Sequence, residues 1–237
     1  MPDASTVSPA PDATLQVNGQ VLVPDLSGAL WWPAKATLIV ADLHFEKGSS
    51  FAARGQFLPP YDTAATLEKL EKVVEEFQPT ALIALGDSFH DRAAAERVAP
   101  EDRARIGGLT AALDWLWIAG NHDPEPPADW GGHVATEAVV ESLVFRHEAE
   151  PGRPDGEISG HFHPKACVRV RNKRVSARCF VTDGRRLILP SFGAYTGGLD
   201  VLDPAVSDLF PRGFTAQLLG KRRLAAYPDS ALVSIAG

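Results

Sequence analysis

Four short apolar runs in the chain each end in aspartate, asparagine or histidine. They cover residues 37–44, 82–87, 115–123 and 157–163. Runs of this length and composition are typical of buried strands, and open α/β sheets place their ligands at the carboxyl ends of such strands. Packing alone would scatter these polar residue types over the surface. We therefore expect the four strand ends to meet at one site, with Asp87 at its centre.

The pattern of the first half predicts strands that alternate with helices. Residues 15–23 alternate apolar and polar positions around an Asn-Gly pair, the strongest short-range signal for a hairpin. Residues 46–60 follow the second predicted strand region as a long loop. A helix capped by Asp62, with one apolar face and a stop at Pro79, then completes a βαβ unit of parallel strands.

A second helical region continues this pattern before the pattern changes. Residues 91–113 are predicted to be helical, with Pro100 suited to a first helical turn. From about residue 134 the segments are short, β-rich and separated by turns. The sheet structure should therefore be parallel in the first half and mostly antiparallel afterwards. We expect residues 1–13, which are small, polar and proline-rich, to form a flexible tail, and residues 14–237 to form a single domain.

Composition places few limits on function. With 45% hydrophobic and 22% charged residues, the chain is typical of a globular protein. No stretch approaches the roughly 18 continuous apolar residues of a membrane helix, and the start lacks the pattern of a signal peptide, so we expect a cytoplasmic protein without membrane contact. The formal charge of −7 argues against a nucleic-acid binder that uses its whole surface, although a local basic patch would override it.

Cysteine usage is sparse. Cys167 and Cys179 are too few for a disulfide framework, and the simplest interpretation is a pair of reduced, buried thiols. A hairpin over residues 166–182 centred near Lys173 would place the two opposite each other. A disulfide is therefore the alternative.

The polar residues at the strand ends are metal-ligand types. Oxygen donors combined with imidazoles suit Mn²⁺, Fe or Zn²⁺ better than Mg²⁺ or Ca²⁺, which prefer shells of oxygen alone. In an extended chain, residues two apart point to the same side, so Asp42 with His44 and His161 with His163 can each reach into one cleft. These spacings favour a site for two metal ions.

Five ordered motifs carry a resemblance to a known family. They are Asp42-Leu43-His44, Gly86-Asp87, Gly120-Asn121-His122-Asp123, His147 and Gly160-His161-Phe162-His163. Together they resemble the signature motifs of the calcineurin-like metallophosphoesterases. The resemblance implies an α/β fold, a four-layer αββα sandwich of mixed sheets with helices on the outer faces.

The same resemblance implies a set of roles. Asp42, His44 and His163 would hold one divalent metal ion. Asn121, His147 and His161 would hold a second. Asp87 would bridge both ions, and His122 would face the substrate as the catalytic residue. The sequence departs from the family pattern at Arg146, because a glycine often precedes the second-metal histidine.

Flanking segments are similar to the bacterial ligase-associated DNA damage response endonucleases within this superfamily. These segments start at Asp42, Leu58, Gly86 and Leu189. The resemblance implies a manganese-dependent phosphodiesterase that cuts single-stranded DNA, with DNA ligase and helicase repair proteins as partners. Zinc and iron remain open as the metal.

Two further groups of residues are candidates for supporting roles. We expect His90, Asp91 and Asp123 to lie behind the metal ligands, where His90 and Asp91 would orient a ligand imidazole. A basic segment that follows the last motif is a candidate nucleic-acid surface, and the alternative is a solvated hairpin face. Its residues are Lys165, Arg169, Arg171, Lys173 and Arg174.

These observations favour hydrolysis of a phosphodiester by water activated between two cations. His122 would donate a proton to the leaving oxygen or stabilise the phosphoryl oxygens. Two alternatives stay open: a small-molecule phosphodiester or pyrophosphate hydrolase that uses the same site, and a non-catalytic scaffold with the same fold.

Overall fold

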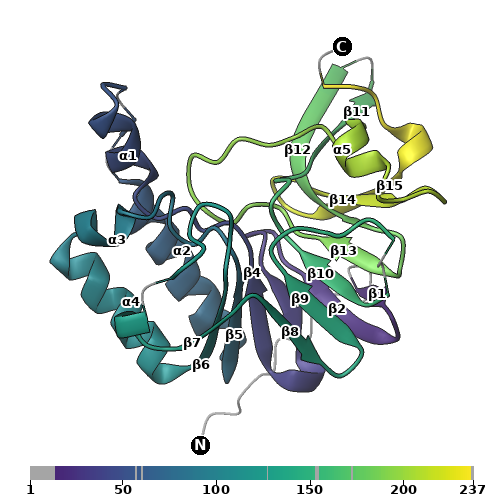
Figure 1. Ribbon diagram of the computed structural model, residues 1–237. Coiled ribbons are helices and arrows are strands. Elements are labelled where there is room, and N and C mark those ends of the chain that lie inside the picture. The colour runs from purple at the N-terminus through teal and green to yellow at the C-terminus, as the bar shows by residue number, and fades with distance from the viewer. Residues whose placement is uncertain are drawn as a thin grey trace, which may run out of the picture.

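Two β-sheets lie face to face in the computed structural model of the protein (Figure 1). The structure describes residues 14–56, 58–59, 61–126, 128–152, 155–171 and 173–235. The expected tail, residues 1–13, lies outside the described residues. Within those residues, no helix has both the length and the apolar composition needed to cross a membrane.

The first sheet follows the chain in strict order, from β1 to β7. Its strands are β1 (Leu15–Val17), β2 (Gln20–Pro24), β3 (Leu30–Trp32), β4 (Thr37–Val40), β5 (Ala81–Leu85), β6 (Asp114–Ile118) and β7 (His133–Ala135). Strands β1 to β4 are antiparallel neighbours, whereas β4 to β7 are parallel. The predicted Asn-Gly hairpin is confirmed, since Asn18 and Gly19 take φ values of 46° and 82° in its turn.

The second sheet has the order β15-β14-β12-β13-β10-β9-β8, and β11 pairs with β12. Its strands are β8 (Glu137–Val140), β9 (Leu143–Arg146), β10 (Glu157–Ser159), β11 (Lys165–Val170), β12 (Lys173–Thr182), β13 (Arg186–Ile188), β14 (Thr215–Leu219) and β15 (Leu224–Pro228). Strand β10 runs parallel to β9 and β13, and the other pairs are antiparallel. The expected change to mostly antiparallel pairing is confirmed.

The helices depart from the sequence-based expectations at two places. They are α1 (Lys47–Ala53), α2 (Asp62–Phe77), α3 (Ala94–Arg97), α4 (Pro100–Ala112) and α5 (Pro204–Ser207), with short 3-10 turns at η1 (Pro33–Lys35), η2 (Ala128–Trp130) and η3 (Asp229–Ala231). The sequence predicts a loop over residues 46–60, but α1 forms there. Asp62 is the first residue of α2 and not its cap, and its carboxylate accepts a hydrogen bond from the backbone of Gly48 at 3.1 Å.

Three hydrophobic cores separate four layers, so the predicted four-layer α/β sandwich is confirmed. Helices α2 and α4 cover the outer face of the first sheet through residues such as Leu70 and Ile106. The inner faces of the two sheets meet in a core that includes Trp32 and Phe145. Helix α5 and the segment that contains Phe210 cover the outer face of the second sheet. The fourth layer is thin, because α5 has a single turn (Figure 1).

The cysteines are not opposite each other. Strand β11 ends at Val170 and β12 begins at Lys173, so the register pairs Cys167 with Ser176, and Cys179 lies beyond the last paired position. The turn lies before the centre that the sequence suggested, and the expectation of opposed cysteines is wrong. Both thiols are buried and free, which confirms the simpler interpretation.

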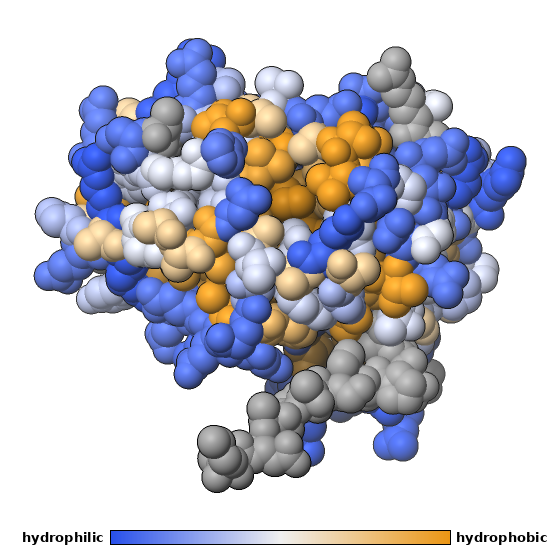
Figure 2. Space-filling view, turned by 90° about the horizontal axis from the view of Figure 1, so that it is seen from below, coloured by the Kyte–Doolittle hydropathy of each residue, from blue (hydrophilic) through white to orange (hydrophobic). Residues whose placement is uncertain are grey.

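A cavity of about 460 Å³ opens at the amino ends of the parallel strands. It is lined in part by Thr37, Ala81 and Asp114, the first residues of β4, β5 and β6. Figure 2 shows the molecule from below, with patches of hydrophobic residues framed by hydrophilic ones. The candidate ligands lie at the carboxyl ends of the same strands, so this cavity is not their site.

Candidate metal centre

The predicted strand ends meet at one edge of the sandwich. The backbone N–H of His44 donates to the carbonyl of Asp87 at 2.9 Å, which joins the ends of β4 and β5. From the second sheet, the N–H of Gly160 donates to the carbonyl of His147 at 2.9 Å. The N–H of His161 donates to the Asp42 carboxylate at 3.1 Å, which links the two sheets. Residues about 120 positions apart in the chain therefore share one site.

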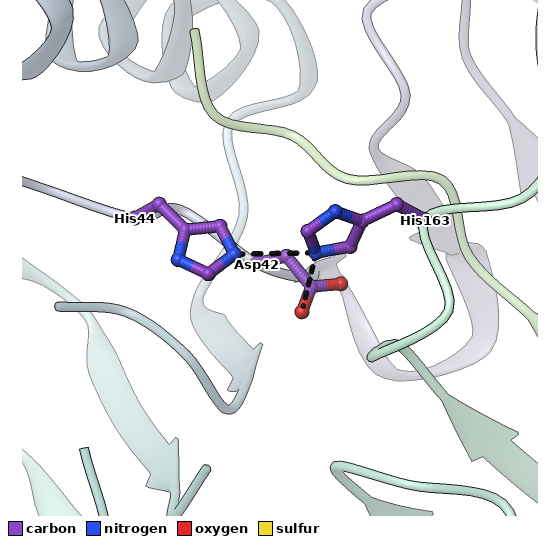
Figure 3. Close-up of side chains that lie close together, drawn as sticks. All are labelled: Asp42, His44 and His163. Carbon is purple, nitrogen blue, oxygen red and sulfur yellow. Dashed lines mark hydrogen bonds and ion pairs between the residues drawn. The ribbon is translucent and has the colours of Figure 1, made fainter. Parts of the chain in front are cut away.

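Asp42, His44 and His163 form the first group of possible ligands. Their side chains point toward one another in Figure 3, with Asp42 and His44 from the segment after β4 and His163 from the segment after β10. The Nε2 atom of His163 lies 3.2 Å from Nε2 of His44 and 3.2 Å from Oδ1 of Asp42. The ligand atoms all lie within 4.8 Å of one another, close enough to surround one cation.

Asp87, His147 and His161 form a second group with the same spacing. The Nε2 atom of His147 lies 3.4 Å from Oδ2 of Asp87 and 3.1 Å from Nδ1 of His161. Oδ1 of Asn121 lies 2.8 Å from the same His147 nitrogen and 3.0 Å from the His161 nitrogen. The same oxygen of Asp87 also lies 4.0 Å from Nε2 of His44, so this carboxylate stands between the two groups.

Hydrogen bonds to carbonyls orient two of the imidazoles. Because a carbonyl only accepts, Nδ1 of His147 carries the hydrogen that it donates to the carbonyl of Leu85 at 3.0 Å. Its Nε2 atom therefore faces the second group, and it can bind a cation once it has lost its own proton. In the same way, Nδ1 of His122 donates to the carbonyl of His90 at 2.8 Å, and its Nε2 lies 3.9 Å from Asp87. The His122 side chain is 41% exposed, more than the buried ligands around it.

Electrostatics prepare the two groups for a cation. Burial and the neighbouring His163 lower the pKa of His44 to about 2, so its imidazole is neutral. Burial disfavours charge on His147, yet the hydrogen bond and charge of Asp87 and the charge of Asp42 raise its pKa to about 9. Burial acts against the charged form of Asp87, but its hydrogen bond with His147 holds its pKa below the usual range. A cation that binds here displaces the proton of His147.

Backbone strain is concentrated in the same residues. Non-glycine residues at positive φ are uncommon, and their strain is typical of functional sites. Five of the seven candidate ligands lie in this region, with φ values of 55°, 47°, 46°, 69° and 47° at Asp42, His44, Asp87, His161 and His163. The fold therefore keeps these side chains in position although their backbone conformations are unfavourable.

Comparison with known proteins identifies the family. The family model for calcineurin-like phosphoesterases matches residues 36–205, which include every candidate ligand. The chain is a calcineurin-like phosphoesterase. Nuclease MPE of Pseudomonas putida shares 30% sequence identity over 91% of this chain and 98% of its own, with a TM-score of 0.69. YfcE, a phosphoesterase from E. coli, shares 13% identity over 81% of this chain and 97% of its own, with a TM-score of 0.41. No curated protein matches the chain.

Membership of the family makes this protein a metal-dependent phosphoesterase, and its residues fit divalent cations. Imidazole nitrogens and carboxylate oxygens converge in both groups, and the carboxylates of Asp42 and Asp87 are buried. Buried charges of this kind require a counter-charge, and divalent cations supply one.

The three residues expected behind the ligands occupy different places in this phosphoesterase. Nδ1 of His90 lies 3.4 Å from Nδ1 of His44, the position expected for a residue that orients a ligand. The Asp91 carboxylate instead accepts hydrogen bonds from Arg97 at 2.7 Å and from the backbone of Ala93. Asp91 is therefore held by Arg97 and the backbone, and it acts on the imidazole of His90 only through its charge.

Asp123 braces the backbone beneath the site. Its carboxylate accepts from the N–H groups of Ser88, Phe89 and Gly120 at 2.9, 3.1 and 3.2 Å. These bonds tie the segment after β5 to the segment after β6. Burial, reinforced by the charge of Asp87, raises the pKa of Asp123 to about 7, although the backbone bonds act in the opposite direction.

The basic segment forms the hairpin of β11 and β12, which projects from the second sheet (Figure 1). Lys165 begins β11, two residues after His163, whereas the other four basic residues lie near the tip of the hairpin. Arg169 and Arg174 face each other across the strands, and Arg174 also donates to the carbonyls of Ser234 and Ile235. The structure thus separates Lys165 from the basic residues at the tip.

Sequence reasoning assigned no role to several residues that border the site. Glu148 Oε1 lies 3.6 Å from Nε2 of His161, on the side of the ring away from the ligands. The segment that starts at Leu189 also contacts the site directly, since the N–H of Gly193 donates to the Asp42 carbonyl at 3.1 Å. A Cβ on Gly193 would lie 2.1 Å from the Leu43 carbonyl oxygen, so the glycine permits this approach.

Proposed function

We propose that this phosphoesterase is a manganese-dependent endonuclease that cleaves single-stranded DNA. The observation that carries the proposal is the 30% identity with a nuclease over nearly the full length of both chains, combined with the two adjacent ligand groups. The proposal assigns Asp42, His44 and His163 to one cation and Asn121, His147 and His161 to the other. Asp87 would contribute to both positions, since its Oδ2 lies 4.0 Å from Nε2 of His44 and 3.4 Å from Nε2 of His147.

The donor set supports manganese. Three of the four donors around the second cation are nitrogen or amide oxygen atoms, and imidazole ligands favour Mn²⁺, Zn²⁺ or Fe²⁺ over Mg²⁺. Each group also includes a carboxylate, which suits Mn²⁺.

The residues of the site have separate tasks in the proposed reaction. Two divalent cations, when bound, polarise a phosphodiester and increase the acidity of water for in-line attack. Asp87 sets the spacing between the two positions. His122 holds a proton on Nδ1 through the carbonyl of His90, so its exposed Nε2, once protonated, donates to the leaving oxygen. His90 keeps both His44 and His122 in place, through its ring and its carbonyl.

The projecting hairpin supports a polymeric substrate. Replacing Arg169, Arg171 and Lys173 together with alanine should weaken cleavage of single-stranded DNA and flatten its dependence on salt, because a polymer alone reaches charges at the tip. Hydrolysis of bis(p-nitrophenyl) phosphate by the same variant is the control. Equal losses on both substrates would instead indicate a damaged site, and unchanged DNA cleavage would make the hairpin a solvated face.

The proposal extends to partners and location. The resembling endonucleases are found with DNA repair proteins, so we include DNA ligase and helicase repair proteins as partners and the cytoplasm as the place of action. Co-purification of a tagged chain with these proteins, with and without nuclease treatment, separates direct contact from joint binding to DNA.

The experiment that tests the function combines metal content with cleavage. Metal-free protein is loaded with Mn²⁺, Zn²⁺, Mg²⁺ or Fe²⁺, and bound metal is measured beside cleavage of circular single-stranded DNA, a small diester and nucleoside pyrophosphates. We expect two ions per chain and the fastest cleavage of the DNA circle with Mn²⁺. Turnover confined to small substrates would favour a small-molecule hydrolase. Failure to bind two ions, without turnover of any substrate, would favour a scaffold.

A further inference from the structure

A second cavity lies beside the metal centre, between helix α2 and the segment 190–197. Its volume is about 240 Å³. Thr66 and Lys69 line it from α2, Arg178 lines it from β12, and residues 192–196 form the remaining wall. We call it the Lys69/Arg178 pocket.

Two cations face this pocket, and no carboxylate of the described residues is in contact with either of them. Lys69 Nζ donates to the carbonyl of Phe192 at 2.8 Å and lies 3.8 Å from the centre of the Phe192 ring. Arg178 Nη1 donates to the carbonyl of Ser191 at 2.6 Å. Across the described ranges of the chain, neither side chain has a carboxylate oxygen within 4.0 Å. Each cation has more N–H donors than its single carbonyl partner satisfies.

The two charges are held in an unfavourable environment. Burial, together with the charge of Arg178, lowers the pKa of Lys69 to about 7, and Asp25 offsets this only in part. Burial also lowers the pKa of Arg178. Two like charges that are removed from water destabilise a fold unless an anion compensates them. Both side chains are only partly exposed, and holding a surface segment in place does not require a second partly buried cation beside the first.

The wall of the pocket is also the wall of the metal centre. The N–H of Phe192 donates to the carbonyl of Ala41 at 2.7 Å, and the next N–H, of Gly193, donates to the carbonyl of Asp42. On the other side, the N–H of Ala194 donates to Oγ1 of Thr66 in the pocket. One short segment therefore connects a proposed metal ligand to the lining of the pocket.

An aromatic side chain stands in the wall of the pocket. Tyr195 is 48% exposed, and its φ of 55° is unusual for a bulky residue. Strained backbone at an exposed aromatic residue is typical of a binding position. Bases of single-stranded nucleic acids stack on such rings, while cations beside them contact the phosphates.

We infer that the Lys69/Arg178 pocket binds a second phosphate of the DNA strand, next to the one that is cleaved, while Tyr195 stacks on a neighbouring base. This inference rests on the proposed function and adds a binding position to it. A phosphate fits because its oxygens accept several charge-assisted hydrogen bonds at once, which matches the unsatisfied donors of Lys69 and Arg178. A strand that spans both positions is then held in register over the metal centre.

The test compares substrates with one and with several phosphates. The ratio of kcat/KM for a single-stranded decamer to kcat/KM for dithymidine monophosphate, which has a single diester, is measured with Mn²⁺ at several salt concentrations. For Lys69→Met this ratio should fall roughly ten-fold, as expected when a charged hydrogen bond is lost. The slope of log KM against log salt for the decamer should fall by about 0.7, the value for one phosphate contact on a single strand.

Two further variants separate binding from folding. Lys72→Met removes the same charge from the same helix outside the pocket, where Lys72 is exposed and pairs with Glu68, and the ratio should stay at the wild-type value. Arg178→Lys keeps a cation, so its ratio of the two kcat/KM values should stay near that of the wild type. Arg178→Met removes the cation, and its ratio should fall as in Lys69→Met.

Each remaining outcome contradicts a defined part of the argument. Equal losses on the decamer and the dinucleotide in Lys69→Met would mean that Lys69 only supports the segment 190–197, and the inference would be wrong. An unchanged ratio, or the same fall in Lys72→Met, would also overturn it. A wild-type protein that hydrolyses aryl diesters but cleaves no DNA would contradict the proposed function. It would then also contradict the inference that the pocket binds a phosphate of DNA.

Discussion

Gly120 offers the sharpest test of how the metal centre is built. It lies two residues after the end of β6, where it packs against Asp87 from the segment after β5. An added Cβ would lie 2.2 Å from the backbone nitrogen of Asp87, 2.3 Å from its Oδ1 and 2.6 Å from Oδ1 of Asp123. Non-bonded heavy atoms are in favourable contact at about 3.5 Å or more, so Gly120→Ala requires the neighbouring atoms to move by roughly 1 Å.

Asp87 is the group that has to move. Its carbonyl accepts from the N–H of His44 at 2.9 Å, and its carboxylate accepts from the N–H of His122 at 2.9 Å. Asp123 is fixed by its three backbone bonds, so it cannot yield alone. A displacement of about 1 Å in a reacting group costs on the order of 100-fold in rate. Overpacking should also lower the free energy of unfolding by about 1–3 kcal/mol.

The assay measures hydrolysis of bis(p-nitrophenyl) phosphate with Mn²⁺, bound metal, and thermal unfolding. Gly107→Ala in helix α4 is the matched control, because nothing lies within 4 Å of its added Cβ. The control should keep wild-type turnover and gain about 0.5–1 kcal/mol of stability, since alanine is the better helix former. Wild-type turnover and two bound ions in Gly120→Ala would refute the reasoning.

Three further predictions concern single side chains. Asp87→Ala should empty both metal positions and abolish turnover, whereas His44→Ala should mainly empty one; metal analysis of the two variants distinguishes a bridging ligand from a peripheral one. His122→Ala should keep both metals and lose up to roughly 10²–10⁴-fold on DNA but less on an aryl diester, whose leaving group needs no proton; loss of metal would show that His122 is a ligand. Lys69 has an ordinary pKa of 10.5 and a folded pKa of about 7, so between these values the unfolded state binds the extra proton and stability should rise with pH, by at most about 1.4 kcal/mol per unit. Denaturant unfolding of wild type and Lys69→Met across pH 7 to 10 should show this rise in the wild type alone, and parallel curves would contradict it.

Residue type and local spacing determined much of this protein. The apolar runs predicted the parallel strands, because a strand that is buried on both faces appears in the sequence as a short continuous run of apolar residues. Asp42 with His44, and His161 with His163, were found from their spacing in the chain. The order of five motifs was enough to indicate the family that the comparison confirms. These features are local, or are ordered along the chain, and need no knowledge of packing.

Other features depend on contacts between distant segments, and only the tertiary structure decided them. Cys167 and Cys179 lie apart because the turn of their hairpin falls before its apparent centre. Five of the candidate ligands have positive φ values at the edge where segments from both sheets meet, and no local sequence pattern predicts these values.

Lys69 and Arg178 lie 109 positions apart in the chain and appear in it as an ordinary helix lysine and an ordinary strand arginine. The fold partly buries them against the segment 190–197 and brings them to one cavity. The sequence gives the chemical type of each side chain, but the desolvation and the partners of that side chain depend on non-local packing. The sequence therefore determined which residues were able to bind metal, and the fold decided which other charges lie beside them.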